Sequence, residues 1–250
     1  MKLKFLFFTG IAVAFSCVSS ETTDPLKLWK ELEKNSLANT LSKGEKKAGW
    51  QLLFDGKTTE GWHGYNMNTF PDCWAVEDGA LTMNTSGSGE SLDILTSEVY
   101  RNFAFSVEYK LTKAANSGII YQIKEDTLYK FPYETGPEFQ VIDHENWPDP
   151  LEDWQINGAN YAMYPPAAKI YKPVGEWNRL LLIVNGNNVT QILNGEVVVQ
   201  YEKYSEEWLT RKNSGKWLAF PDWGKFDEGK ISLQNHGTKV WYRSVKIKVI

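Results

Sequence analysis

From residue 50 onward, apolar residues come in short runs that alternate with polar residues and end at turn residues. Runs rich in Val, Ile, Phe, Tyr and Trp favour β-strands, because branched and aromatic side chains pack well on a pleated surface. The sequence predicts strands at 103–111, 118–123, 138–142, 177–184, 189–193, 197–201, 230–233 and 240–249. Asn185-Gly186 and Asn194-Gly195 lie between apolar runs, which favours tight hairpins there.

The order of these runs indicates the fold class. Strands do not alternate with long amphipathic helices, which argues against a parallel α/β sheet. Many antiparallel strands between residues 50 and 250 predict an all-β fold of two packed sheets, a sandwich or jelly roll. Three long irregular connections, 66–71, 143–172 and 202–227, interrupt the strands, and loops of that length are usually functional.

The first sixteen residues follow a different pattern. Lys2 and Lys4 form a short basic start, and residues 5–15 are almost wholly apolar but too short to span a bilayer. This pattern predicts an export signal, residues 1–16, that is removed. The segment ends at Cys17 and resembles a bacterial lipoprotein box, although Ala14 stands where Leu is commoner.

We therefore expect lipidation of Cys17, with acyl chains holding an exported protein at a membrane. The protein would be a periplasmic or cell-surface lipoprotein of a bacterium. The alternative is an ordinary signal peptide that is cut nearby. If Cys17 carries lipid, Cys73 stays alone and no intrachain disulfide can form.

Residues 17–46 are expected to form a tether and one short helix, ahead of a domain at 47–250. Asp24-Pro25 supplies an N-cap and a proline at the first helical position. The apolar residues that recur at helical spacing are Leu26, Trp29, Leu32 and Leu37. The helix should end by Lys43 and pack on the domain, and an interaction helix is the alternative.

Composition adds two points about partners. The chain has 11 Trp, 12 Tyr and 12 Phe, and surplus Trp suits sugar binding because a pyranose face stacks on an indole, although any single Trp is more often a core residue. The net charge is −4 and no basic block stands out, so nothing favours nucleic acid as a partner.

Strand periodicity sorts the polar residues of two segments. In 138–142, Phe139 and Val141 share one face while Glu138 and Gln140 share the other. In 231–236, the apolar Ile231 and Leu233 likewise oppose the polar Ser232, Gln234 and His236. Glu, Gln and His have fixed hydrogen-bonding geometry that suits sugar hydroxyls, so the two polar rows predict one site; a solvated sheet face is the alternative.

Other candidate residues flank these rows. An unbroken strand would turn His144 toward the site and Asp143 toward the core, whereas a bulge or strand end would reverse them. A divalent metal could be imagined on Glu138, Asp143, His144 and His236, but no metal-binding spacing supports or excludes it. Asn116-Ser117-Gly118 is either a turn or a close approach of backbone to ligand, and Asp55-Gly56 favours a turn.

Several stretches together resemble the 3-keto-disaccharide hydrolase domain family. They include Asn116-Ser117-Gly118-Ile119 and Glu138-Phe139-Gln140-Val141-Ile142-Asp143. The full set, in the family's order, is 50–57, 61–62, 74–81, 95–97, 116–119, 138–143, 177–178, 193–195 and 231–237. Each stretch by itself is weak evidence for the family, but the ordered set is specific and spans nearly all of residues 50–250.

The resemblance implies a concanavalin A-like jelly-roll β-sandwich with a carbohydrate site on its concave sheet. It also implies cleavage of glycosides whose sugar carries a ketone at C3, together with a separate sugar oxidoreductase. Gln122 stands where the family commonly has Arg, which puts the substrate specificity in doubt. The segment 157–172, with Tyr161, Tyr164 and Lys169, resembles the family's loop over the site.

A C3 ketone acidifies the proton on C2, and the resulting enolate can expel the C1 substituent before water adds back. The residue roles we expect are His236 or Asp143 as base and Glu138 in acid–base support. The expected substrate-binding residues are Trp62, Asn116, Tyr121, Gln140, Tyr161, Lys169 and Gln234. Direct hydrolysis stays open, as do a non-catalytic lectin-like module on the same fold and a structural surface protein.

Overall fold

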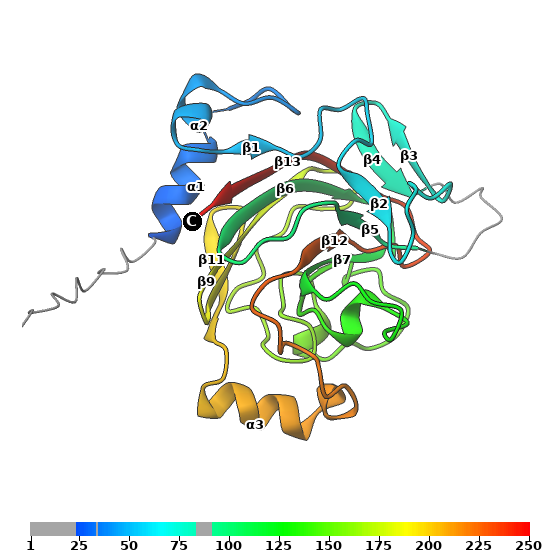
Figure 1. Ribbon diagram of the computed structural model, residues 1–250, viewed down its shortest axis with the longest axis vertical. Coiled ribbons are helices and arrows are strands. Elements are labelled where there is room, and N and C mark those ends of the chain that lie inside the picture. Colours follow the sequence, from blue (N-terminus) through cyan, green and yellow to red (C-terminus); the bar gives the residue numbers. More distant parts are fainter. Residues whose placement is uncertain (1–23, 34, 84–91) are drawn as a thin grey trace, which may run out of the picture.

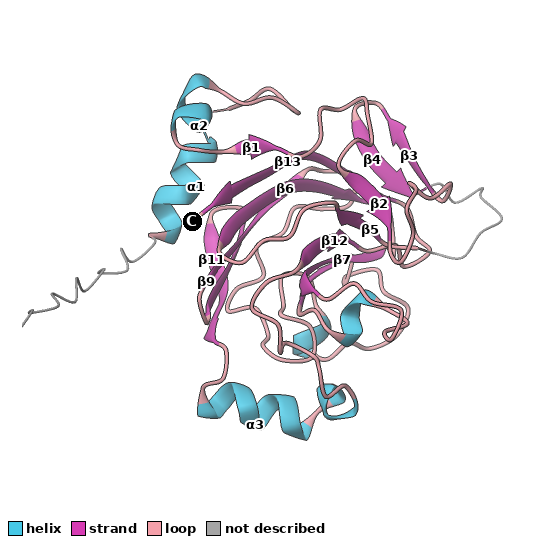
Figure 2. Ribbon diagram, viewed as in Figure 1, coloured by secondary structure: helices cyan, strands magenta, loops and turns pink. Residues whose placement is uncertain are grey.

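The computed structural model describes residues 24–33, 35–83 and 92–250, so the predicted signal peptide and Cys17 lie outside it. Within this part of the chain, thirteen strands form two antiparallel sheets that pack face to face (Figure 2). The predicted all-β sandwich is confirmed. No helix of the described residues is long and apolar enough to cross a membrane.

Sheet A, with eight strands, arches over sheet B, with five (Figure 1). Sheet A comprises, in spatial order, β11 (Glu196–Glu202), β10 (Asn188–Leu193), β9 (Asn178–Asn185), β6 (Phe103–Leu111), β13 (Val240–Val249), β4 (Ala80–Met83) and β3 (Trp74–Glu77), with β1 (Gln51–Leu52) paired to β13. Sheet B comprises β2 (Trp62–Gly64), β5 (Ile94–Thr96), β12 (Lys230–Leu233), β7 (Asn116–Ile123) and β8 (Glu138–Ile142).

Alternate side chains of both sheets fill the space between them. Phe103 and Phe105 of sheet A and Phe139 and Val141 of sheet B belong to one buried cluster. Apolar burial of this extent is the main contribution to stability, at about 25 cal/mol for each Å² removed from water. Each predicted strand is present to within about two residues, because strong alternation and turn residues marked its ends.

The α-helices lie at opposite ends of the molecule, with α1 (Pro25–Glu33) and α2 (Lys43–Lys47) beside sheet A and α3 (Glu206–Ser214) at the far end (Figure 2). The 3-10 turns are η1 (Pro132–Glu134), η2 (Asp153–Gln155) and η3 (Lys216–Ala219). Helix α1 packs on the outer face of sheet A, where Trp29 and Leu32 join Leu181 and Ile183 in a second apolar cluster. The outer face of sheet B is therefore free of the N-terminal elements.

Two helix boundaries differ from the sequence prediction. The first helix ends at Glu33 rather than near Lys43, and Leu37, expected on its apolar face, is 69% exposed. Ser42 begins a separate short helix, α2, through a capping box with Glu45. Helix α3 lies inside the 202–227 segment, which was expected to be irregular; Ser205 caps it by accepting the Trp208 N–H.

One buried ion pair ties the N-terminal segment to the sandwich. The Lys246 ammonium of β13 donates to the Glu45 carboxylate at 2.5 Å, and both side chains are almost fully buried. Burial acts to raise the pKa of Glu45, but the hydrogen bonds from Lys246, Ser42 and Asn35 outweigh it and the pKa is lowered. Glu45 is therefore a charged carboxylate in the folded protein.

We expect Lys246→Met to lower the free energy of unfolding by about 3–5 kcal/mol, because it leaves the Glu45 charge buried without its partner. Arg101→Met is the matched control: it breaks an exposed pair with Glu228 and should cost less than about 1 kcal/mol. Urea unfolding of both variants measures the difference. Equal losses would contradict the role assigned to the buried pair.

Candidate active site

The outer face of sheet B carries a row of polar side chains. Strand pairing places Glu138 beside Ile120 and Gln140 beside Gly118, and the Gln234 N–H donates to the Gly118 carbonyl. Because paired residues of antiparallel strands point to the same face, Gly118, Glu138 and Gln140 share it. The alternation predicted from the sequence is confirmed here: Phe139 and Val141 point into the core.

Glu138 is the central group of this face. Its side chain is 5% exposed, and no described residue donates a hydrogen bond to its carboxyl oxygens. A methyl group at Gly118 would overlap the Glu138 carboxyl, so the absence of a side chain there lets the carboxyl lie flat over β7. Burial raises the pKa of Glu138 to about 8, with Lys216 acting against this and Asp93 adding to it.

The loop after β8 covers the edge of sheet B. The Gly158 N–H donates to the Gln140 carbonyl, Gln140 donates back to Ala159, and the Tyr161 N–H donates to the Glu138 carbonyl at 3.0 Å. These bonds satisfy a strand edge that would otherwise be open. They also fix Tyr161 next to Glu138.

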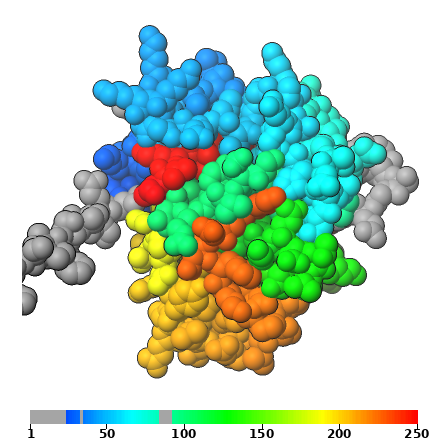
Figure 3. Space-filling model, viewed as in Figure 1, coloured from blue at the N-terminus to red at the C-terminus, as the bar shows by residue number. Residues whose placement is uncertain are grey.

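The segment after β11 supplies a cation. The Trp217 indole donates to the Tyr161 carbonyl at 3.2 Å and stacks on Trp223 with ring centres 4.5 Å apart. The preceding Lys216 ammonium lies 4.5 Å from the Tyr161 ring and 5.2 Å from the Tyr133 ring. Figure 3 shows this segment (gold to orange) closing the lower end of the molecule. The Lys216 charge is close enough to Glu138 to lower the pKa of that carboxyl.

Asp93 supplies a second buried carboxyl. It directly precedes β5, is 9% exposed, and its Oδ1 accepts the Asn235 N–H at 2.8 Å. Burial raises the pKa of Asp93 to about 7, although the Asn235 N–H and the neighbouring Ser232 hydroxyl act against it. Its charge also raises the pKa of Glu138, so the two carboxyls lie within electrostatic range of each other.

A cavity of about 540 Å³ lies beside Asp93. Its polar lining includes Asp93, Gln234 and His236, and its aromatic wall includes Phe131 and Tyr133, whose rings stack 5.1 Å apart. A polar floor with an aromatic wall is typical of small-molecule sites, and aromatic faces suit the apolar side of a sugar ring.

Two buried side-chain amide oxygens on this face have no hydrogen-bond partner among the described residues. Asn116 Oδ1 and Gln234 Oε1 receive no hydrogen bond from the described residues, although both side chains are more than nine-tenths buried. An unpaired buried acceptor costs about 1–3 kcal/mol. Both oxygens are therefore available to accept from hydroxyl groups of a ligand.

Comparison with known proteins decides the family. Residues 49–248 match the 3-keto-alpha-glucoside-1,2-lyase-like domain. The chain belongs to this family. It is 33% identical to the 3-keto-disaccharide hydrolase of Bacteroides thetaiotaomicron, in an alignment that covers 81% of this chain and 79% of that protein.

Two solved structures from Parabacteroides distasonis, both described as candidate glycosyl hydrolases, share the fold. One is 42% identical with a TM-score of 0.81, over 86% of this chain and all of that chain. The other is 26% identical with a TM-score of 0.62, over 80% of this chain and 99% of that chain. The jelly-roll architecture implied by the sequence resemblance is thereby shown.

Within this family fold, the structure brings most of the expected site residues together. The residues that share the outer face of sheet B or its rim are Asn116, Glu138, Gln140, Tyr161, Gln234 and His236. Gln140 is 3% exposed, with its amide nitrogen donating to the Gln155 carbonyl. His236 is exposed at the cavity mouth.

Two expected aromatic residues lie between the sheets instead. Trp62 is 5% exposed and its indole donates to the Leu53 carbonyl at 2.7 Å. Tyr121 is fully buried and its hydroxyl lies 2.5 Å from the Tyr201 hydroxyl. Both side chains face the core cluster, away from the polar face of sheet B.

Asp143 and Lys169 are also apart from Glu138. Strand β8 ends before Asp143, whose carboxylate accepts the Ala114 N–H at 2.7 Å and the Asn146 amide at 3.1 Å. Lys169 is exposed, and its charge acts on His144, whose pKa is lowered first by burial and then by this lysine. Asp143 therefore holds a loop, and Lys169 lies on the rim beyond it.

Gln122, at the family's arginine position, makes structural contacts. Its side-chain oxygen accepts from the buried Lys203 ammonium at 3.0 Å, and its nitrogen donates to the Asp227 carbonyl at 2.8 Å. The residue has a positive φ of 54°, which marks the irregular pairing of β7 with β12. The side chain thus supports the α3 segment.

Sequence reasoning missed Asp93, Lys216 and Tyr133. Asp93 carried a usable signal, since it stands two residues before the buried Leu95 and therefore shares its strand face. Lys216 and Tyr133 carried none, because they reach the site from loops. Among the described residues, no three His, Cys, Asp or Glu side chains group in a way that could hold a metal.

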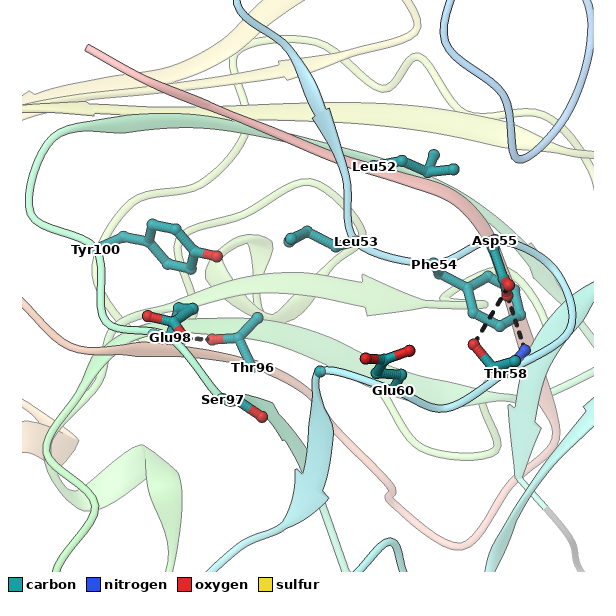
Figure 4. A pocket seen from close by; sticks show the side chains of 11 residues that line it. Leu52, Leu53, Phe54, Asp55, Thr58, Glu60, Thr96, Ser97, Glu98 and Tyr100 are labelled. Atoms are coloured by element: carbon teal, nitrogen blue, oxygen red, sulfur yellow. Dashed lines mark hydrogen bonds between the residues drawn. The ribbon is translucent and has the colours of Figure 1, made fainter.

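A separate cavity of about 330 Å³ lies between the 52–61 segment and residues 96–100 (Figure 4). Its Asp55 accepts the Lys57 and Thr58 N–H groups at 2.8 and 2.7 Å, which confirms the turn predicted at Asp55-Gly56. The Thr96 hydroxyl donates to the Glu98 carbonyl. These groups are satisfied within the protein, in contrast to the face around Glu138.

We expect Gly118→Ala to lower kcat/KM by about 10–100-fold, because the added methyl group displaces the Glu138 carboxyl from the sheet face. The fold should survive, since the displaced atoms end a flexible side chain. Gly44→Ala, at a glycine with room for a methyl group, is the matched control. Steady-state kinetics with thermal unfolding would contradict this role if both variants kept full activity.

Proposed function

We propose that this protein cleaves glycosides whose sugar carries a ketone at C3, by removal of the C2 proton, elimination at C1 and addition of water. Membership of the 3-keto-alpha-glucoside-1,2-lyase-like family and the named activity of the Bacteroides relative support this substrate class. The observation that carries the proposal is the buried, unpaired carboxyl of Glu138 with a pKa near 8. Such a group holds a proton at neutral pH and can donate it.

This reaction requires a proton donor for the leaving group and does not require two charged carboxylates. The ketone lets a base remove the C2 proton, so bond cleavage at C1 proceeds from an enolate. The departing oxygen then requires a proton, which Glu138 supplies. The Lys216 ammonium is the cation placed to stabilise negative charge developing on the sugar.

Substrate binding follows from the groups around Glu138. Asn116 Oδ1 and Gln234 Oε1 accept hydrogen bonds from sugar hydroxyls and thereby gain the partners they lack. The Tyr133 and Tyr161 rings, with Lys216 between them, offer faces for the apolar side of the sugar.

A lectin-like binding module is the second candidate. The same unpaired acceptors and aromatic faces would serve binding without turnover. Binding alone does not require an uncharged carboxyl, which favours the enzyme. Turnover of a 3-keto-glycoside, with no turnover of the matching unoxidised glycoside, separates the two.

We also propose the export and lipidation of Cys17. Helix α1 packs on the outer face of sheet A, and the Glu138 site is on the outer face of sheet B. A tether that leads into α1 would therefore leave the site directed away from a membrane. A separate sugar oxidoreductase would supply the C3 ketone.

We expect Glu138→Gln to reduce kcat for 3-keto-glycosides with sugar or alkyl leaving groups by about 100-fold or more. The loss should be far smaller for a 4-nitrophenyl leaving group, which departs without a proton. Glu176→Gln, at an exposed glutamate, is the control. Equal losses for both kinds of leaving group would exclude proton donation by Glu138.

The proton on Glu138 should make the activity depend on pH. Activity should fall as the pH rises through about 8, because Glu138 then loses the proton it must donate. The Lys216 charge lowers the pKa of Glu138, so Lys216→Met should move this fall to higher pH. Lys225→Met, which removes an exposed lysine of the same segment, should leave the pH at which activity falls unchanged. A pH profile of kcat/KM that is identical in all three proteins would contradict the assignment.

A further inference from the structure

We propose that Asp93 is the general base that removes the C2 proton, acting across the outer face of sheet B from Glu138. This inference rests on the proposed function and names the group that function leaves unassigned.

The strand order separates Asp93 from Glu138 by two strands of sheet B. Asp93 leads into β5, Glu138 begins β8, and β12 and β7 lie between them in sheet B. The sheet surface between the two carboxyls holds Gly118, which has no side chain, and the end of β12 at Gln234. A ligand resting on this surface would meet one carboxyl on each side.

The Asp93 carboxyl is held at one oxygen by the backbone, since its Oδ1 accepts the Asn235 N–H at 2.8 Å. The Ser232 hydroxyl is its other neighbouring donor, and it lowers the pKa of Asp93. Asp93 also lines the 540 Å³ cavity directly. The backbone therefore fixes the orientation of the carboxyl at the cavity surface, where it can take a proton from a bound sugar.

Burial raises the pKa of both carboxyls, to about 7 for Asp93 and about 8 for Glu138, and the Asp93 charge adds to the rise at Glu138. A lower pKa for Asp93 than for Glu138 favours Asp93 as the carboxylate and Glu138 as the carboxylic acid, which is the combination that elimination needs.

The other candidate bases are less well placed. Asp143 uses its carboxylate to hold the Ala114 N–H and the Asn146 amide. His236 is exposed at the mouth of the cavity, where water reaches it freely. Asp93 is the buried carboxyl that faces the same space as Gln234.

The steps balance in protons and electrons. Asp93 takes the C2 proton, and the C–H electron pair forms the C2–C3 double bond of an enolate. The enolate restores the ketone, the C1–C2 double bond forms, and the C1–oxygen bond breaks while Glu138 protonates the departing oxygen. Water then adds its oxygen to C1 and a proton to Glu138, and Asp93 returns its proton to C2.

Proton exchange at C2 tests this assignment directly. The full-length protein is incubated in D₂O with a 3-keto-glucoside, and loss of the C2–H signal is followed by NMR beside cleavage. We expect Asp93→Asn to slow exchange and cleavage by about 100-fold or more, for good and poor leaving groups alike. Glu138→Gln should retain exchange while losing cleavage of poor leaving groups.

Two further variants complete the test. Formate should restore exchange to Asp93→Ala, because a small carboxylate can occupy the vacated space, and a structural role would show no such rescue. Asp149→Asn, at an exposed aspartate, should exchange as the wild type does. Wild-type exchange in Asp93→Asn, or no rescue of a folded Asp93→Ala, would overturn the assignment to Asp93 alone. Absence of both exchange and cleavage in the wild type would overturn the proposed function together with it.

Discussion

The site depends on one carboxyl that is buried without a hydrogen-bond donor. Transferring a charged carboxylate out of water is costly unless it is paired, so Glu138 keeps its proton at neutral pH instead. Three features of the fold produce this state: Gly118 leaves room for the carboxyl, the 158–161 segment closes the strand edge, and the Trp217 indole holds that segment by donating to the Tyr161 carbonyl. The Lys216 charge limits the rise in the pKa of Glu138, so Glu138 can still lose its proton.

The outer faces of the two sheets serve different functions. The outer face of sheet A binds the N-terminal helices through an apolar cluster and the buried Glu45–Lys246 pair. The outer face of sheet B carries unpaired acceptors and raised carboxyl pKa values, which lower stability and serve chemistry. The apolar core between the two sheets provides stability that offsets the destabilising groups of the site.

The strands and the polar face could be predicted because both follow from a period of two residues. That period placed Glu138 and Gln140 outward and Phe139 inward, as observed. Residue type alone could not distinguish core aromatics from sugar-facing ones, so Trp62 and Tyr121 were expected in the site and lie in the core. Lys216 could not be found from sequence, because its approach to Glu138 depends on how two loops far apart in the chain pack through Trp217.

The central claim is that Glu138 is a carboxylic acid in the resting protein. Carbon-13 NMR of the glutamate carboxyl groups, assigned by difference against Glu138→Gln, measures its titration. The account predicts a midpoint near 8 for this residue. A midpoint near its ordinary value of 4.5 would show a charged Glu138 at neutral pH and would contradict the account.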